Sequence, residues 1–295
     1  LPRSTQAELP LEEKVESEKA ALRGDPRKAA RRGRPEVPIQ RKTSTAGLRS
    51  YTNDLVNLFF DALPHAKKHR TLLEFRDFLY ESLPVNSQIT RERYSQYMLN
   101  RFFPRDHFSR DLILFSDAFE GTPSLKEAMF YLTAVSEPIL AKVAAEVVFP
   151  ALHRGVLSRR DLRNGVEARL QVASSAVADT AQAIIRTYGR LGIAEVNTKE
   201  LKLRLREGSL DSFVFILHRE FPQPGIFSFN RILEGPMHTW LLWSQDWIRQ
   251  SLYRLQEMGI LAKVSEIDSI RQFSTRYSPD EGMERWVRLR KESKG

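Results

Sequence analysis

Cysteine is absent from this chain of 295 residues, and its absence excludes several kinds of chemistry. Without a thiol the chain forms no disulfide, binds no metal through thiolate ligands and has no cysteine nucleophile. The chain also lacks an apolar run near the length of about 20 residues that a membrane-spanning helix needs, and it begins without the hydrophobic stretch of a signal peptide. These absences favour a cytoplasmic protein that does not insert into a membrane.

Three sequence motifs that mark common enzyme classes are missing as well. The chain has no Gly-rich phosphate loop ending in Lys-Ser or Lys-Thr, no Gly-x-Ser-x-Gly nucleophile turn and no His-Glu-x-x-His metal site. We therefore expect a protein that is not an enzyme and that needs neither a cofactor nor a metal.

Two groups of residues could indicate a metal site or a nuclease site. His65 and His69 have the spacing of one helical face, but Lys67 and Lys68 between them oppose a bound cation. A nuclease would need clustered carboxylates. The acidic residues considered for such a site lack a paired strand with a catalytic lysine, so acids on the surface of a helix are the favoured explanation. These residues are Asp106, Asp111 and Asp117.

Aromatic residues are missing from residues 1–50 and begin at Tyr51. The first fifty residues therefore bury too little apolar area to offset the entropy of ordering, and we predict a flexible arm. The net charge of the chain is +9, and residues 20–49 hold much of it, with nine basic and two acidic side chains. Such a segment attracts polyanions, and nucleic acid is favoured over a membrane because the segment has no apolar face that could insert.

The most informative segment of the arm is Arg31-Arg32-Gly33-Arg34-Pro35. Glycine has no side chain to hold the backbone off a narrow DNA groove, and the proline keeps the chain extended, so two guanidinium groups can reach along the groove floor. Arg32-Gly33-Arg34-Pro35 resembles the core of the AT-hook, a short DNA-binding peptide family. The resemblance implies minor-groove binding at A/T-rich DNA, and the alternative is an arginine-rich linker.

From Tyr51 onward apolar residues recur at spacings of three and four, which is typical of amphipathic helices. One predicted helix covers residues 91–103 with Thr90 as its N-cap, and together with the preceding helix it forms a helix–turn–helix pattern. Such a helix suits a major groove, where arginine reads guanine and Asn or Gln reads adenine, but the same pattern fits a solvated face of a helical bundle. The side chains expected to face outward are Arg91, Arg93, Gln96, Asn100 and Arg101.

The middle of the chain is predicted to be a helical scaffold. Apolar residues from 129 to 148 indicate a long buried helix with a bend at Pro138, and a later helical face ends at Gly192. Arg154, Arg159 and Arg160 could touch phosphates, although solvated surface arginines are the simpler explanation. We assign no chemistry to this region.

The C-terminal third has the order helix, strand, turn, strand, which is the back half of a winged helix. Ser244 begins the helix and Gly259 ends it, and strands are predicted over residues 260–264 and 271–277. Glu266 and Asp268 in the turn would repel phosphates, and winged helices also bind proteins, so DNA contact by this unit is one of two options. The candidate contacts are Arg249, Gln250, Arg254, Arg271 and Arg276.

Residues 72–195 resemble, in segment order and residue character, the small all-helical BrxA family of bacterial BREX phage-defence systems. The resemblance implies a non-catalytic protein whose winged-helix units bind double-stranded DNA within a larger defence assembly, with Arg91, Arg93 and Arg101 as transferable contacts. The segments that carry the resemblance are Ile89-Thr90-Arg91-Glu92-Arg93-Tyr94, the apolar residues 128–148, and residues 181–193 with Tyr188, Leu191, Gly192 and Ile193.

Together these patterns predict a mainly α protein with two helix–turn–helix or winged-helix units and a short C-terminal β-hairpin wing. The predicted parts are a basic arm (1–50), an N-terminal helix–turn–helix unit (51–122), a helical middle region (123–208) and a C-terminal winged-helix unit (209–295). We expect the protein to bind duplex DNA, with other protein subunits of a defence complex as partners. The alternative is an interaction subunit that makes no DNA contact, because residues 213–229 and 240–247 are rich in apolar and aromatic side chains.

Overall fold

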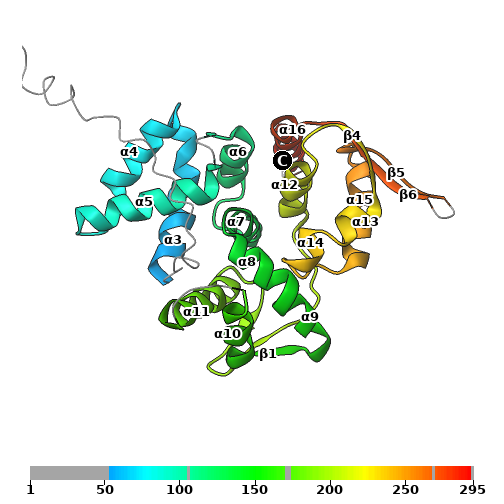
Figure 1. Ribbon diagram of the computed structural model, residues 1–295. Coiled ribbons are helices and arrows are strands. Elements are labelled where there is room, and N and C mark those ends of the chain that lie inside the picture. Colours follow the sequence, from blue (N-terminus) through cyan, green and yellow to red (C-terminus); the bar gives the residue numbers. More distant parts are fainter. Residues whose placement is uncertain (1–52, 105–106, 170–173, 268–269, 294–295) are drawn as a thin grey trace, which may run out of the picture. The chain divides into compact units, whose positions relative to one another are not determined.

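The computed structural model of the chain describes residues 53–104, 107–169, 174–267 and 270–293 (Figure 1). These residues belong to one compact unit within residues 43–295. The unit is mainly helical and has two small antiparallel sheets, which confirms the mainly α class. The arm segment with Arg31, Arg32, Gly33 and Arg34 lies outside the described residues, and the internal boundaries after residues 122 and 208 stay predictions.

The first helices surround a core of phenylalanine rings, in which Phe59 and Phe102 meet edge to face with ring centroids 5.9 Å apart. Ser87 begins α5, because its side chain accepts a hydrogen bond from the backbone N–H of Thr90 at 3.4 Å. The prediction that Thr90 caps this helix was therefore wrong, since Thr90 lies in the first turn. The elements are α3 (Asn53–Ala62), η1 (Leu63–Lys68), α4 (Leu72–Ser82), α5 (Gln88–Phe102) and α6 (Arg110–Ala118).

A proline divides the next helical stretch. Pro138 has no backbone N–H to continue the helical hydrogen bonds, so the predicted bend is a break between two helices. The helix before the break is buried along most of its length and packs against α5 on one side. The elements are α7 (Pro123–Ser136), α8 (Pro138–Val143), the π-helical turn η3 (Ala144–Val148), α9 (Phe149–Ala151) and η4 (Leu152–Arg154).

A three-stranded sheet lies in the middle region, where the sequence patterns indicated helices alone. Its antiparallel strand order is β1-β3-β2, with Leu157 and Val196 each paired to Leu201. Ser158 begins the first helix after β1 by accepting a hydrogen bond from Asp161 N–H at 3.0 Å. The elements are β1 (Val156–Ser158), α10 (Arg159–Glu167), α11 (Ser174–Arg190), β2 (Glu195–Val196) and β3 (Glu200–Lys202).

A second three-stranded sheet lies in the C-terminal region, with strand order β4-β6-β5. Ser244 begins α15 as expected, because its side chain accepts a hydrogen bond from Trp247 N–H at 3.1 Å. In Figure 1 the strands lie beside α13 and α15. The elements are α12 (Leu210–Glu220), β4 (Gly225–Ser228), α13 (Phe229–Leu233), α14 (Pro236–Thr239), α15 (Gln245–Glu257), β5 (Leu261–Ile267), β6 (Ile270–Thr275) and α16 (Pro279–Glu292).

The two sheets belong to segments with the same order of elements. In both segments a strand is followed by helices and then by two more strands, and the last strand lies in the centre of the sheet. In both, the helix that precedes the final strand pair is long and ends near a glycine with positive φ, Gly192 after α11 and Gly259 after α15. The chain therefore uses one local architecture twice.

A buried carboxylate fixes the connection between the two segments. Glu127 on α7 is 2% exposed and accepts hydrogen bonds from Ser209 N–H at 3.0 Å and from the Ser212 hydroxyl. It also forms an ion pair with the guanidinium group of Arg206. Because the charge of Glu127 is fully compensated, α7, the connecting residues and the start of α12 are held together.

We expect the stability of the fold to fall below pH 6.5 because of His218 on α12. The ring is 1% exposed and Nδ1 donates to the Val214 carbonyl at 2.9 Å. Burial lowers the pKa of His218 from 6.5, against the opposing effects of the Val214 hydrogen bond and the charge of Asp111. The unfolded chain therefore binds the proton first, so the stabilisation is complete above pH 6.5 and is lost at up to about 1.4 kcal/mol per pH unit as the pH falls.

Urea unfolding of the wild type and of H218L between pH 7.5 and 5.0 measures this effect. We expect the unfolding free energy of H218L to depend less on pH in that range. An identical pH dependence in both proteins would show that other groups cause it.

Candidate nucleic-acid interface

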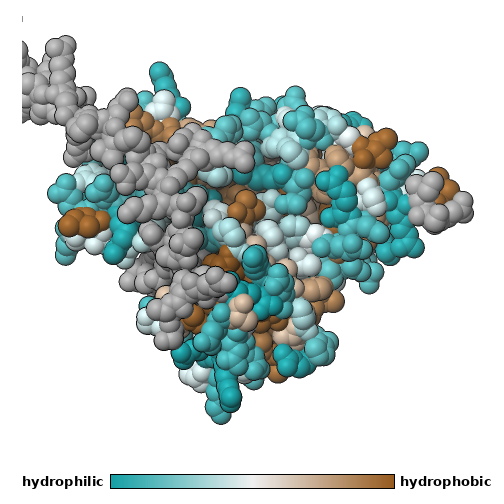
Figure 2. All heavy atoms as spheres, in the orientation of Figure 1, coloured by the Kyte–Doolittle hydropathy of each residue, from teal (hydrophilic) through white to brown (hydrophobic). Residues whose placement is uncertain are grey.

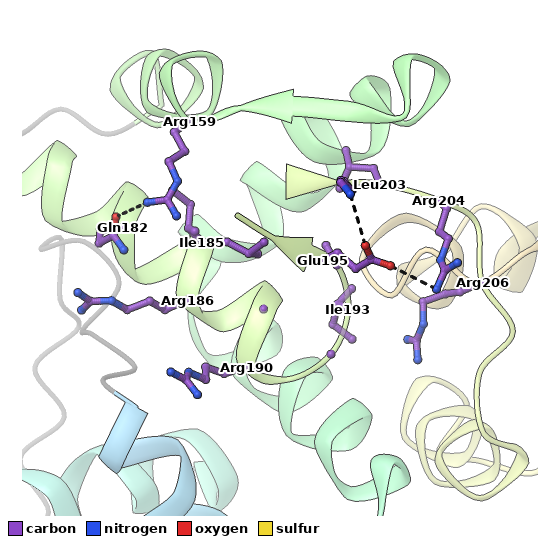
Figure 3. Close-up of a pocket in the computed structure, with 15 residues that line it drawn as sticks. Arg159, Gln182, Ile185, Arg186, Arg190, Ile193, Glu195, Leu203, Arg204 and Arg206 are labelled. Atoms are coloured by element: carbon purple, nitrogen blue, oxygen red, sulfur yellow. Dashed lines mark hydrogen bonds and ion pairs between the residues drawn. The ribbon is translucent and has the colours of Figure 1, made fainter. Parts of the chain in front are cut away.

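A pocket of about 970 Å³ lies between α11 and the strands β2 and β3. Figure 3 shows its lining side chains. Six of them are basic and one, Glu195, is acidic. We call this the basic pocket, and its charged and polar side chains are Arg159, Gln182, Arg186, Arg190, Glu195, Lys202, Arg204 and Arg206.

One wall of the basic pocket is the exposed face of α11. Arg186 and Arg190 are four residues apart, so they lie one above the other with a rise of about 6 Å along the helix axis. Both are exposed, and Figure 3 shows no contact from either to the other residues drawn. The opposite face of the helix is apolar and buried, which leaves this arginine pair on the exposed side of α11. The residues of the buried face include Val177, Ala181, Ile184 and Tyr188.

The second wall follows β3 and the residues after it. The carboxylate of Glu195 on β2 lies 3.9 Å from Lys202 Nζ and 3.7 Å from an Arg204 guanidinium nitrogen. All three side chains are exposed, so these pairs contribute little to stability but restrain the two cations. Arg206 continues this wall and is tied to the buried Glu127.

A single arginine joins the parts that form the pocket. Arg159, the first residue of α10, donates two hydrogen bonds to the Asn197 carbonyl, at 3.1 and 2.6 Å, and one to Gln182 Oε1 at 3.3 Å. Asn197 begins the turn between β2 and β3, and its Oδ1 accepts from the backbone N–H groups of Lys199 and Glu200. The turn is therefore closed on itself and fastened to α11.

The charges of the pocket determine what it can bind. Cations that outnumber anions around a concave surface concentrate polyanions by Coulomb attraction. Between the charged walls the floor is apolar and is formed by Ile185, Ile193 and Val196. This arrangement suits a chain of phosphate groups.

The predicted DNA contacts on α5 differ in their exposure to solvent and in their hydrogen bonds. Arg93 is exposed, whereas Arg91 is half-buried and donates to the Tyr80 carbonyl at 3.4 Å. Gln96 donates to Asn100 Oδ1 at 2.8 Å, so one hydrogen bond links the two amides.

Arg101 contradicts the sequence-based expectation. Its side chain is 2% exposed and lies 3.3 Å from a carboxylate oxygen of Glu137. The prediction that Arg101 faces outward was wrong, because α5 packs against α7 and the last turn of α5 is covered. A guanidinium in this place is a structural group and has no access to DNA.

The predicted contacts of the C-terminal segment are largely neutralised by one carboxylate. Glu266 on β5 lies 3.6 Å from Arg249 and 3.4 Å from Arg271, and it accepts a hydrogen bond from the Tyr253 hydroxyl at 3.2 Å. Glu266 was expected to repel phosphates. It also pairs with Arg249 and Arg271, which were two of the proposed DNA contacts. Exposed candidates on this face are Gln250, Arg254 and Arg276, and Asp268 lies outside the described residues.

The histidines considered for a metal site have other contacts. His65 Nδ1 lies 2.9 Å from Lys68 Nζ, and the His69 ring packs on Phe78 with centroids 5.0 Å apart. Within the described ranges no group of three His, Asp or Glu side chains could hold a metal ion.

The carboxylates considered for a nuclease also have partners. Asp111 is paired with Arg219 at 2.7 Å and Asp117 with Lys67. They therefore belong to ion pairs of the helical scaffold, and Asp106 lies outside the described residues.

Of the six cations of the basic pocket, the sequence analysis considered Arg159 alone as a phosphate contact. Two signals were present. Arg186 and Arg190 lie opposite an apolar helical stripe, and a strict alternation of leucine with basic residues begins at Leu201. That alternation is Leu201, Lys202, Leu203, Arg204, Leu205 and Arg206, a strand pattern with one basic face.

No protein-family model matches this chain, and no curated protein or solved structure matches it either. Among the helices that the structure describes, none is long and apolar enough to cross a membrane. The functional proposal is therefore drawn from the basic pocket and its contacts.

Proposed function

We propose that the protein is a non-catalytic duplex-DNA-binding protein and that the basic pocket is its main DNA contact. In this proposal residues 138–203 form a winged helix, with α11 as the recognition helix and β2–β3 as the wing. The support is the order of elements, helix, strand, two helices and two strands, with the last strand central in the sheet. Recognition helices of this kind meet DNA in the major groove while neighbouring parts contact the backbone.

The observation that carries the proposal is the pair Arg186 and Arg190. Among the described residues neither has an ion-pair or hydrogen-bond partner, so both guanidinium groups are available to phosphates. Lys202 and Arg204 face the same pocket from the wing and add two further cations. Binding by such contacts releases counterions, and its affinity falls steeply as salt rises.

The C-terminal segment has the same order of elements, and we propose a second winged helix there with β5–β6 as its wing. The arm with Arg31, Arg32, Gly33 and Arg34 adds a minor-groove contact in this proposal. The BrxA-like segment order supports a place in a multi-protein defence assembly, and partner subunits are part of the same proposal.

A second candidate function is protein interaction by the C-terminal unit. Glu266 neutralises Arg249 and Arg271, and Ile267 beside it is 63% exposed, which suits a protein partner better than a phosphate backbone. On the face drawn in Figure 2, hydrophobic side chains lie in small separate groups among hydrophilic ones. This face therefore offers limited apolar area to a partner.

Fluorescence anisotropy of the full chain with a labelled duplex over a salt series tests the proposal. We expect binding that weakens linearly in a plot of log affinity against log salt. Absence of binding at low salt, or binding that does not depend on salt, would reject the DNA-binding function and favour the protein-interaction candidate.

Removing the acidic side chain of the pocket is expected to strengthen DNA binding. Replacing Glu195 with Gln removes the negative charge between Lys202 and Arg204, so we expect duplex affinity to rise about two- to fivefold at low salt. E200Q makes the same charge change on the adjacent strand outside the pocket, and its effect should be smaller. Equal effects of E195Q and E200Q would show that net charge and not the pocket determines affinity.

A further inference from the structure

We infer that the basic pocket holds the sugar–phosphate backbone of duplex DNA without reading the base sequence. This inference rests on the proposed function and makes it more specific, because it names the part of the DNA that the pocket recognises. The side chains of Gln182 and Arg159 are held by hydrogen bonds within the protein, and the exposed cations lie where a recognition helix meets phosphates.

Gln182 is the amide side chain of the pocket, and an amide reads adenine by accepting from N6 and donating to N7 at the same time. Its acceptor Oε1 already receives a hydrogen bond from Arg159 at 3.3 Å. That bond uses one of the two lone pairs of Oε1 and fixes the orientation of the amide group. Gln182 is therefore held in the pocket wall by Arg159.

Arg159 is held in place by hydrogen bonds within the protein. A bidentate contact to guanine needs two free guanidinium donors that point at O6 and N7. Three of the five guanidinium N–H groups of Arg159 are already donated, two to the Asn197 carbonyl and one to Gln182, and these bonds fix the direction of the remaining two. Moving it would also release the turn between β2 and β3, which Asn197 Oδ1 closes through Lys199 and Glu200.

The free arginines lie at the wrong end of α11 for base reading. A recognition helix places its N-terminal residues against base edges, and its C-terminal end contacts the DNA backbone. Arg186 and Arg190 occupy the last two turns of the helix Ser174–Arg190. Lys202 and Arg204 extend the same positive surface along the wing and are restrained by Glu195. These four cations are therefore placed for phosphates.

A selection from a random pool of duplexes, followed by sequencing, tests the inference. The protein is the full chain with R32A and R34A, so that an A/T preference of the arm does not contribute. We expect relative affinities within about threefold across the pool, and the same spread with Q182A added. A further variant, D179N, tests the exposed Asp179, which lies one turn before Gln182. Its carboxylate could accept a hydrogen bond from cytosine.

A base motif enriched more than tenfold and lost in Q182A or D179N would overturn the inference while leaving duplex binding in place. Failure to retain any duplex by a folded protein would overturn both the inference and the proposed function. Affinities that are uniform over the pool and fall with salt would support both.

Discussion

Replacing Arg186 and Arg190 together with alanine is expected to lower duplex affinity at least about tenfold at moderate salt. The reason is that both guanidinium groups are exposed and available, so each substitution removes one phosphate contact. The slope of log affinity against log salt should become shallower by about two units, since each contact contributes nearly one. Fluorescence anisotropy of the full chain over a salt series measures both quantities.

The matched control is R288A/K291A on α16. It removes the same charge from two exposed positions outside the basic pocket. We expect its affinity and salt slope to stay near those of the wild type, and thermal unfolding of both double variants should match the wild type. If R288A/K291A weakened binding as much as R186A/R190A, the basic pocket would have no special role and general positive charge would explain binding.

Replacing Glu127 with alanine is expected to reduce the unfolding free energy by about 3 kcal/mol. Glu127 is buried and accepts hydrogen bonds from Ser209 and Ser212 in addition to its ion pair with Arg206. Its removal leaves these donors and the Arg206 charge without a partner. The side chain of Arg206 is 21% exposed and can partly reach water, so we expect the lower end of the range for broken buried pairs. Urea unfolding measures the change.

The control for this substitution is E120A, at an exposed glutamate that should change stability by less than about 0.5 kcal/mol. The double variant E127A/R206A should recover part of the loss, since it removes the unpaired charge as well. A loss under 1 kcal/mol in E127A would contradict the account of this buried network, and additive effects of E127A and R206A would show that the two side chains are not coupled.

Local sequence signals predicted the helices well where an apolar stripe and a cap occur together. Ser244 before α15 is such a case, and its predicted cap is confirmed. Thr90 and Ser87 are both suitable caps three residues apart, and the sequence analysis chose Thr90 where the structure has Ser87. Arg101 was misplaced because its burial depends on α7, a helix that is distant in sequence.

The basic pocket could not be assembled from sequence patterns in the same way. Arg186 and Arg190 come from a helix, whereas Lys202 and Arg204 come from a short strand, and their meeting depends on the fold between them. Strands β1 and β2 span three and two residues, too few to show alternation against a helical background. The leucine–basic alternation from Leu201 to Arg206 was the usable signal.

The two repeated segments differ most in the charge of comparable faces. On the C-terminal segment Glu266 binds Arg249 and Arg271, while on the middle segment Arg186 and Arg190 are open. We therefore expect the middle segment to dominate DNA binding.

Hydrogen–deuterium exchange of the full chain with and without a duplex tests this central claim most directly. We predict slower exchange on binding in residues 182–206, which include the end of α11, β2, β3 and the residues of the second wall. Residues 245–275 should change little. Protection confined to residues 245–275 or to the arm, with none in residues 182–206, would contradict the assignment of the basic pocket as the DNA contact.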